Sequence, residues 1–200
     1  MSKPLVIALR GPLGSGKTAA AKYLATKYDF RVVSFATPLK EAAKKITPDG
    51  RIDKKRDRAL LQFLGTEYFR GIDSEHWVKQ FMATAESFVE HGLSVVTDDC
   101  RFPNEQAAVR KLGGFEVYIN TPADKIGSLL LARDGEIAKG ISGHASEAMN
   151  DPSDPSIDVV IDNQFDIGQL YFELDHMLID LRKIAAEREN SSALSSEQTG

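Results

Sequence analysis

The segment from Gly11 to Thr18 constrains the fold of this chain more than any other part of its sequence. Its residues, Gly-Pro-Leu-Gly-Ser-Gly-Lys-Thr, fit the pattern G-x-x-x-x-G-K-[ST] at every fixed position. An apolar run, Leu5 to Leu9, precedes it, and an Ala-rich helical stretch to Tyr28 follows it. Because glycines let a backbone turn its N–H groups inward, this order of strand, turn and helix predicts a loop that surrounds phosphate oxygens.

The same loop suggests roles for individual side chains. We expect Lys17 to reach the β- and γ-phosphates of ATP, and the Thr18 hydroxyl to bind Mg²⁺. The pattern predicts the phosphoryl donor but leaves the acceptor open, because GTPases, motor ATPases and small-molecule kinases all use it. The residues expected to bind ATP in this loop are Gly11, Gly14, Ser15, Gly16, Lys17 and Thr18.

Strand-like and helix-like segments alternate along the rest of the chain. The strand-like runs are 5–9, 31–35, 93–97, 115–119 and 157–161. Between and after them lie helical patterns at 18–28, 38–46, 57–69, 74–91, 103–112, 122–133 and 166–187. Strands separated by helices predict an α/β fold, a five-stranded, mostly parallel sheet with helices on both faces.

Three regions stand out within this plan. The single domain is expected to cover residues 1–189, with a helical insertion at about 37–91 between the second and third strands. Residues from about 133 to 155 are rich in Gly, Asp, Ser and Pro, which is typical of a loop or lid. The Ser-rich residues 190–200 lack apolar periodicity and are expected to form a disordered tail.

Composition narrows the classes of function. With 200 residues and a formal net charge of -4, the chain is not expected to follow nucleic-acid phosphates over a broad surface. Cys100 is the single cysteine and is expected to be a small buried residue, so a reducing cytoplasm, bacterial or phage-infected, is the natural compartment. No apolar run approaches the length of a membrane span. A homodimer stays open.

Charged residues follow the third predicted strand. Asp98, Asp99 and Arg101 should lie beside the phosphate loop, because ligands bind beyond the carboxyl ends of parallel strands. Asp99 is expected to serve the acceptor or the reaction, Asp98 is a second candidate for Mg²⁺, and Arg101 could clamp a phosphate. The alternatives are an aspartate that caps the helix near Pro103 and an arginine in a surface ion pair.

The helical insertion carries a second set of candidates. Arg58, Gln62 and Arg70 have spacings that can share a helix face, which could bind an anionic acceptor. Trp77, the single tryptophan, could stack on a base or fill the core of the insertion.

Three short sequence blocks resemble motifs of one particular kinase family. Gln62–Arg70 with Trp77 resembles the acceptor-binding segment of phage-type deoxynucleoside monophosphate kinases, and Thr97–Glu105 resembles their D-x-R-F-P-N-E motif. His144–Glu147 resembles their H-x-S-E lid signature. The resemblance implies that the γ-phosphate of ATP passes to a deoxynucleoside 5′-monophosphate, giving the diphosphate and ADP. It implies acceptor contacts from Gln62, Gly65, Thr66, Arg70, Trp77, Asp99, Arg101 and Glu105, and lid contacts from His144, Ser146 and Glu147, while Arg58 is an acceptor candidate from its helical spacing.

Two further residues and the rival functions complete the expectations. Arg133 would neutralise charge on the transferring phosphoryl group, or lie at the surface. Asn163 would lie against the adenine of ATP, or form an Asx turn. The rival acceptors are a nucleoside, a coenzyme precursor and a modified DNA base, and the rival class is a non-catalytic nucleotide-binding switch.

Overall fold

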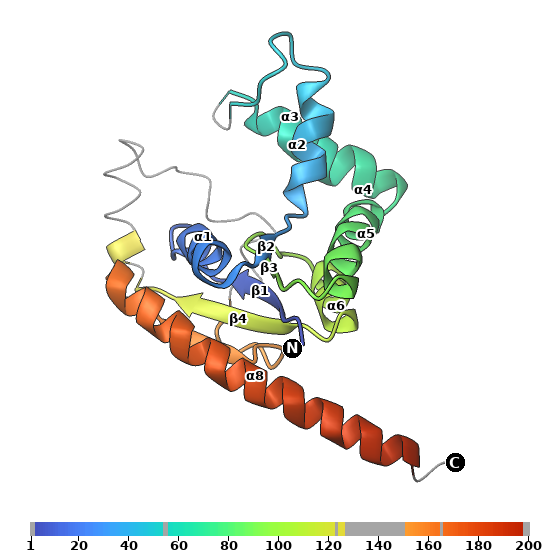
Figure 1. Cartoon of the computed structure of the whole chain (residues 1–200). Helices are drawn as coiled ribbons and strands as arrows, with labels where there is room; N and C mark the ends of the chain where they lie inside the picture. The colour runs from blue at the N-terminus through green and yellow to red at the C-terminus, as the bar shows by residue number, and fades with distance from the viewer. Residues whose placement is uncertain (1–2, 54–55, 123, 127–150, 165, 198–200) are drawn as a thin grey trace.

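The computed structural model describes residues 3–53, 56–122, 124–126, 151–164 and 166–197 (Figure 1). Within this part of the chain, five strands form one sheet in the order β2-β3-β1-β4-β5, and each neighbouring pair is parallel. The fold class predicted from the sequence is therefore confirmed. The strands are β1 (Val6–Arg10), β2 (Arg31–Val32), β3 (Val95–Thr97), β4 (Phe115–Asn120) and β5 (Val159–Asp162).

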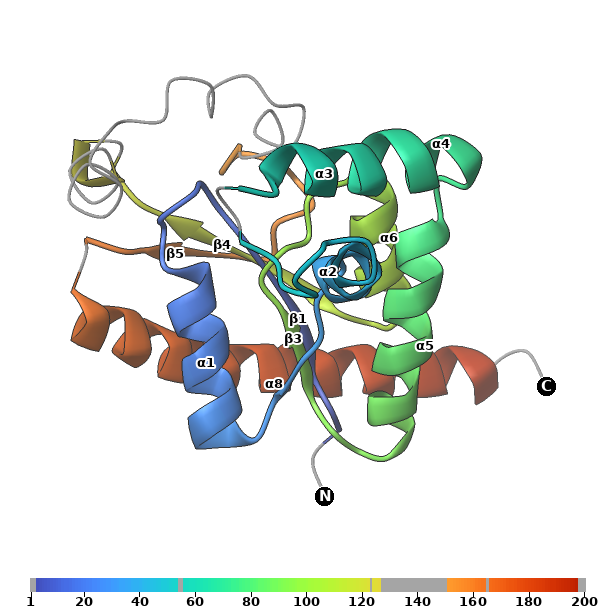
Figure 2. The same cartoon turned by 90° about the horizontal axis from the view of Figure 1, so that it is seen from above.

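Helices cover both faces of this sheet (Figure 2). Because neighbouring residues of a strand point to opposite faces, the strands contribute side chains to two separate cores. One core contains Ile7 and Leu9 together with α1 (Lys17–Tyr28) and α8 (Ile167–Glu197). The other contains Val6 and Ala8 together with α5 (His76–Glu90) and α6 (Pro103–Lys111). Burial on both faces explains why β1 is a continuous apolar run rather than an alternating one.

The region between β2 and β3 is helical, and its first helices stand away from the sheet (Figure 1). The single helix expected over 57–69 is divided into α3 (Arg58–Gln62), the π-helix η1 (Phe63–Tyr68) and α4 (Phe69–Ile72). Helix α2 (Ala36–Lys44) packs closely on η1, since a Cβ atom on Gly65 would lie 2.8 Å from Cδ2 of Leu39. Helix α5 returns the chain to the sheet.

Two predicted boundaries are wrong. Strand β2 ends at Val32 and not near residue 35, because the chain then turns into α2. Helix α8 continues to Glu197, so residues 190–197 are helical and not the irregular tail that their composition suggested. Among the described residues, no helix combines the length and apolar character that crossing a membrane requires.

A buried ion network holds the strand end from which the phosphate loop starts. Arg10 is 3% exposed, and its guanidinium lies 2.6 Å from Oε2 of the fully buried Glu116 and 2.9 Å from Oδ2 of Asp154. Hydrogen bonds from the Ser156 amide and hydroxyl and from Arg10 lower the pKa of Asp154 to about 2, against the effect of burial. Since Arg10 directly precedes Gly11, this network fixes the position of the loop's first residue.

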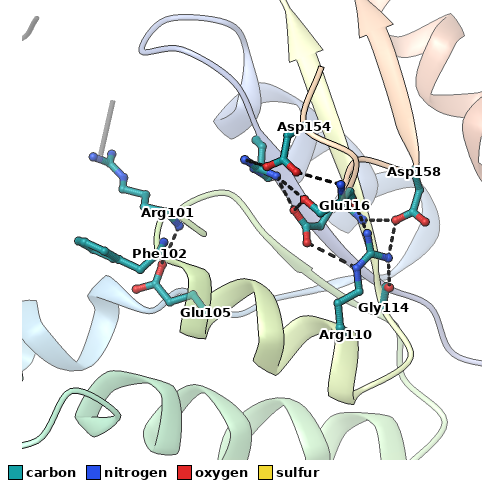
Figure 3. Close-up of polar contacts among 10 residues, drawn as sticks. Arg101, Phe102, Glu105, Arg110, Gly114, Glu116, Asp154 and Asp158 are labelled. Atoms are coloured by element: carbon teal, nitrogen blue, oxygen red, sulfur yellow. Dashed lines mark hydrogen bonds and ion pairs between the residues drawn. The ribbon is translucent and has the colours of Figure 1, made fainter. Parts of the chain in front are cut away.

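Helix α6 joins the same network through its last turn (Figure 3). Nη1 of Arg110 lies 2.6 Å from Asp158 and donates to the carbonyl of Gly114 at 3.1 Å, while its Nε lies 3.5 Å from Glu116. The network therefore ties α6 and the chain before β5 to the centre of the sheet.

Arg10→Met tests this network. Methionine fills similar space but leaves the Glu116 carboxylate buried with a longer ion pair to Arg110, so we expect the free energy of unfolding to fall by about 3–5 kcal/mol. Urea denaturation measures it. The control is Lys27→Met, which breaks a half-exposed pair with Asp175 and should cost less than about 1 kcal/mol. Equal losses in the two variants would contradict a special role of the network.

Candidate active site

The loop between β1 and α1 has a backbone that requires its glycines. Gly11, Gly14 and Gly16 have φ angles of 131°, 86° and 103°, which side chains disfavour. A Cβ atom on Gly11 would also lie 2.4 Å from the carbonyl oxygen of Ile119 on the neighbouring strand. The loop thus has the tight, glycine-dependent course that a phosphate-binding loop needs, and it leads directly into the N-terminus of α1.

Lys17 lies against this loop. Its ammonium group donates to the carbonyl oxygens of Gly11 and Pro12, at 2.7 Å in each case. From there a flexible lysine can reach phosphate oxygens that the loop's amides hold.

Thr18 meets Asp98 at the edge of the sheet. β1 and β3 are parallel neighbours, so the turn after β1 and the end of β3 lie side by side. The Thr18 hydroxyl donates to Oδ2 of Asp98 at 2.7 Å. Hydroxyl and carboxylate oxygens suit Mg²⁺, which in nucleotide sites takes further oxygens from phosphates and water. Within the described residues, no three or more His, Cys, Asp or Glu side chains form a metal-binding group.

Asp99 holds the start of the helical insertion. Its carboxylate accepts hydrogen bonds from the amides of Phe35 and Ala36, at 3.0 and 2.9 Å, and from the hydroxyls of Ser34 and Thr97. Helix α2 has no side-chain cap of its own, so Asp99 supplies the acceptor for its first turn. Asp99 therefore anchors the insertion to the end of β3.

Arg70, Phe102 and Glu105 come together from two separate sequence blocks. The Arg70 guanidinium forms an ion pair with Glu105 and lies 4.1 Å from the ring centre of Phe102. Glu105 is 2% exposed and also accepts from the amides of Arg101 and Phe102, at 2.6 and 3.1 Å. Burial raises the pKa of Glu105, while these bonds and Arg70 oppose the rise.

Arg101 lies beside this group and is exposed. Its side chain extends away from Glu105, although its backbone amide points toward that residue (Figure 3). Gln62 at the end of α3 and Thr66 in η1 are also exposed, and both elements precede α4, which carries Arg70. The part of the site that is predicted to bind the acceptor therefore carries two arginines from different segments, Arg70 in α4 and Arg101 after β3.

Trp77 and Gly65 belong to the interior of the insertion. Trp77 is 2% exposed, and its indole N–H donates to the carbonyl of Gly65 at 3.0 Å. Phe69 and His76 pack edge-on against the same indole. Of the two roles considered for Trp77, core packing is correct and direct stacking on a base is wrong. Both residues therefore shape the interior of the insertion.

Asn163 forms a hydrogen bond with the backbone of the phosphate loop. It is 5% exposed, and its side-chain amide donates to the carbonyl of Ser15 at 2.9 Å. The Thr121 hydroxyl, which sequence reasoning missed, donates to the same oxygen at 3.3 Å. Asn163 thus holds the backbone of the phosphate loop, a role that was not expected from the sequence. Thr121 and Asn163 each directly follow a strand at this edge, which is the signal that could have identified Thr121.

The remaining predicted site residues cannot be placed. Arg133, His144, Ser146 and Glu147 lie outside the described residues, as does the side chain of Arg58. Cys100 is buried as predicted, and burial raises the pKa of its thiol well above the usual value, so a thiolate nucleophile is disfavoured.

Paired substitutions at Asp98 and Asp99 test the division between them. Asp99→Asn should lower the free energy of unfolding by about 1–3 kcal/mol, because its carboxylate oxygens serve several donors. Asp98→Asn should leave stability nearly unchanged and weaken the Mg²⁺-dependent part of ATP affinity roughly tenfold. Urea denaturation and calorimetry with and without Mg²⁺ measure both effects. The opposite pattern would reverse the two assignments.

Solved kinases have the same fold. A gluconokinase from Sinorhizobium meliloti matches with a TM-score of 0.61 and 16% identity, covering 94% of this chain and 99% of that one. An APS kinase from Mycobacterium tuberculosis, in complex with AMPPNP and APS, matches with a TM-score of 0.51 and 20% identity over 89% and 98% of the two chains. At such identities the likeness shows the fold alone, which is that of the P-loop kinases.

Sequence comparison gives the family. No family model matches the chain. A protein of Acanthamoeba polyphaga mimivirus, provisionally named a deoxynucleotide monophosphate kinase, is 31% identical over 144 residues. The match covers 59% of this chain and 75% of the viral protein. With its phosphate loop, its sheet order and this relative, the chain belongs to the deoxynucleotide monophosphate kinase family of P-loop kinases.

Proposed function

We propose that this protein transfers the γ-phosphate of ATP to a deoxynucleoside 5′-monophosphate, giving the diphosphate and ADP. Its family and fold support an ATP-dependent phosphotransferase. The finer choice of a deoxynucleotide acceptor follows the motif blocks at Gln62–Arg70 and Thr97–Glu105 and the mimivirus relative.

One observation carries the proposal: a single short segment, Thr97–Glu105, contacts both halves of the candidate site. At one end, Asp98 accepts from Thr18 at the base of the phosphate loop. At the other end, Glu105 pairs with Arg70 of the insertion, next to Arg101. A donor phosphate on the loop and an acceptor phosphate at the arginines would therefore share one rigid support, as transfer between two phosphates requires.

The chemistry that the side chains would perform is mainly alignment and charge neutralisation. The loop amides and Lys17 would hold the donor phosphates, while Arg70 and Arg101 would hold the acceptor phosphate against its charge repulsion with ATP. When bound at Thr18 and Asp98, Mg²⁺ would supply further positive charge to the donor. An acceptor phosphate is already a nucleophile, so no general base is needed. The engagement of Asp99 with backbone amides agrees with that view.

A panel of acceptors tests the proposed function. With ATP and Mg²⁺, we expect at least one deoxynucleoside monophosphate to give its diphosphate, with a larger kcat/KM than the matching ribonucleotide. The preference for deoxyribose rests on the family. Thin-layer or ion-exchange separation of products measures the rates, and Lys17→Ala should lose most transfer while staying folded. Activity confined to nucleosides or to phosphorylated compounds without a base would refute the nucleotide acceptor.

Substitution of the two arginines separates the acceptor side from the donor side. Arg101→Ala and Arg70→Ala should each raise KM for the monophosphate roughly 10- to 100-fold, because each loses a charged hydrogen bond to its phosphate. KM for ATP should change far less. Arg101→Ala is the cleaner variant, since its side chain is exposed. Steady-state kinetics in which only KM for ATP rises would place both arginines on the donor side.

A further inference from the structure

Glu105 occupies a position that joins two parts of the candidate acceptor site. It lies in the first turn of α6, and its two oxygen atoms serve donors from two distant segments. Oε2 accepts from the amides of Arg101 and Phe102, while Oε1 pairs with Arg70, which is 35 residues earlier in the chain. One carboxylate thus restrains both arginine-bearing segments.

Helix capping alone does not account for this residue. A Glu at the third helical position commonly accepts from the N-cap amide, here that of Phe102, and Gln does so equally well. Such a residue can remain in water, yet Glu105 is 2% exposed. Glutamate is seldom buried this far without a charged partner. The contact with Arg70 therefore points to a task that needs the negative charge.

Arg70 is held but not saturated. Its side chain is 14% exposed, lies over the ring of Phe102 and uses Nη2 for its ion pair with Glu105. A guanidinium has five N–H donors, and the contacts described for Arg70 engage one of its three nitrogens. Donors with so little access to water favour a ligand that brings several acceptors at once, and a phosphate group does so with negative charge.

We propose that Glu105 is a positioning residue, which does not touch the acceptor but holds Arg70 and the backbone of Arg101 so that both arginines bind the same phosphate group. The inference rests on the proposed function, because it takes that phosphate to be the 5′-phosphate of the acceptor nucleotide. Phe102 completes the arrangement by restricting the plane of the Arg70 guanidinium.

Glu105→Gln tests the proposal with little change in shape. Glutamine keeps an oxygen for the amides of Arg101 and Phe102 and removes the charge that holds Arg70. We expect KM for the monophosphate to rise roughly tenfold, with KM for ATP nearly unchanged. In an Arg70→Met background the same substitution should have little further effect, because Glu105 acts through Arg70. An equal effect in both backgrounds, or unchanged kinetics, would overturn the proposal.

Phe102→Leu is the second variant, for the case in which Glu105→Gln folds poorly. It leaves the ion pair intact and removes the ring beneath Arg70, so KM for the monophosphate should rise severalfold while KM for ATP stays constant. An unchanged KM for the monophosphate would contradict the positioning of Arg70. The control is Phe172→Leu on an exposed part of α8, which should change neither constant.

Binding of inorganic phosphate separates this inference from the proposed function. Calorimetry on the protein with its phosphate loop occupied by ADP and Mg²⁺ needs no turnover. Weaker phosphate binding in Glu105→Gln than in the wild type would support the positioning role, and equal binding would overturn it. If the wild type used no deoxynucleotide, the proposed function would fail, and the phosphate result would still decide the role of Glu105.

Discussion

The candidate site depends on carboxylates that accept hydrogen bonds from backbone amides at the starts of helices. Asp99 accepts from the first turn of α2, and Glu105 accepts from the chain that enters α6. Unpaired amides at helix starts are costly when water cannot reach them. The same bonds that satisfy them also fix the insertion and the 97–105 segment relative to the sheet.

The phosphate loop is positioned by the sheet and not by these carboxylates. Parallel pairing of β1 with β3 and β4 brings the ends of these strands to one edge, where the phosphate loop begins. The buried ion pair of Arg10 with Glu116 then holds the residue that directly precedes the loop. Buried ion pairs add little net stability, so this network is better understood as fixing one arrangement of β1, β4 and the chain before β5.

The sequence was sufficient for the features that depend on local pattern. The glycines of the loop and the alternation of strands and helices could both be predicted. It could not show which of two adjacent aspartates faces the loop, because that depends on how the chain leaves β3. Nor could it show that Trp77 is buried or that Asn163 supports Ser15, since both roles depend on contacts between residues far apart in sequence. The π-helix at Phe63–Tyr68 was missed because its pattern matches that of an α-helix.

A crystal structure with a non-hydrolysable ATP analogue, Mg²⁺ and a deoxynucleoside monophosphate tests the central claim most directly. Our account predicts that the acceptor phosphate lies within hydrogen-bond distance of Arg70 and Arg101, in line with the γ-phosphate on the loop. Asp99 and Glu105 should keep their bonds to backbone amides. A monophosphate bound away from both arginines, or an acceptor in direct contact with Asp99, would contradict the account.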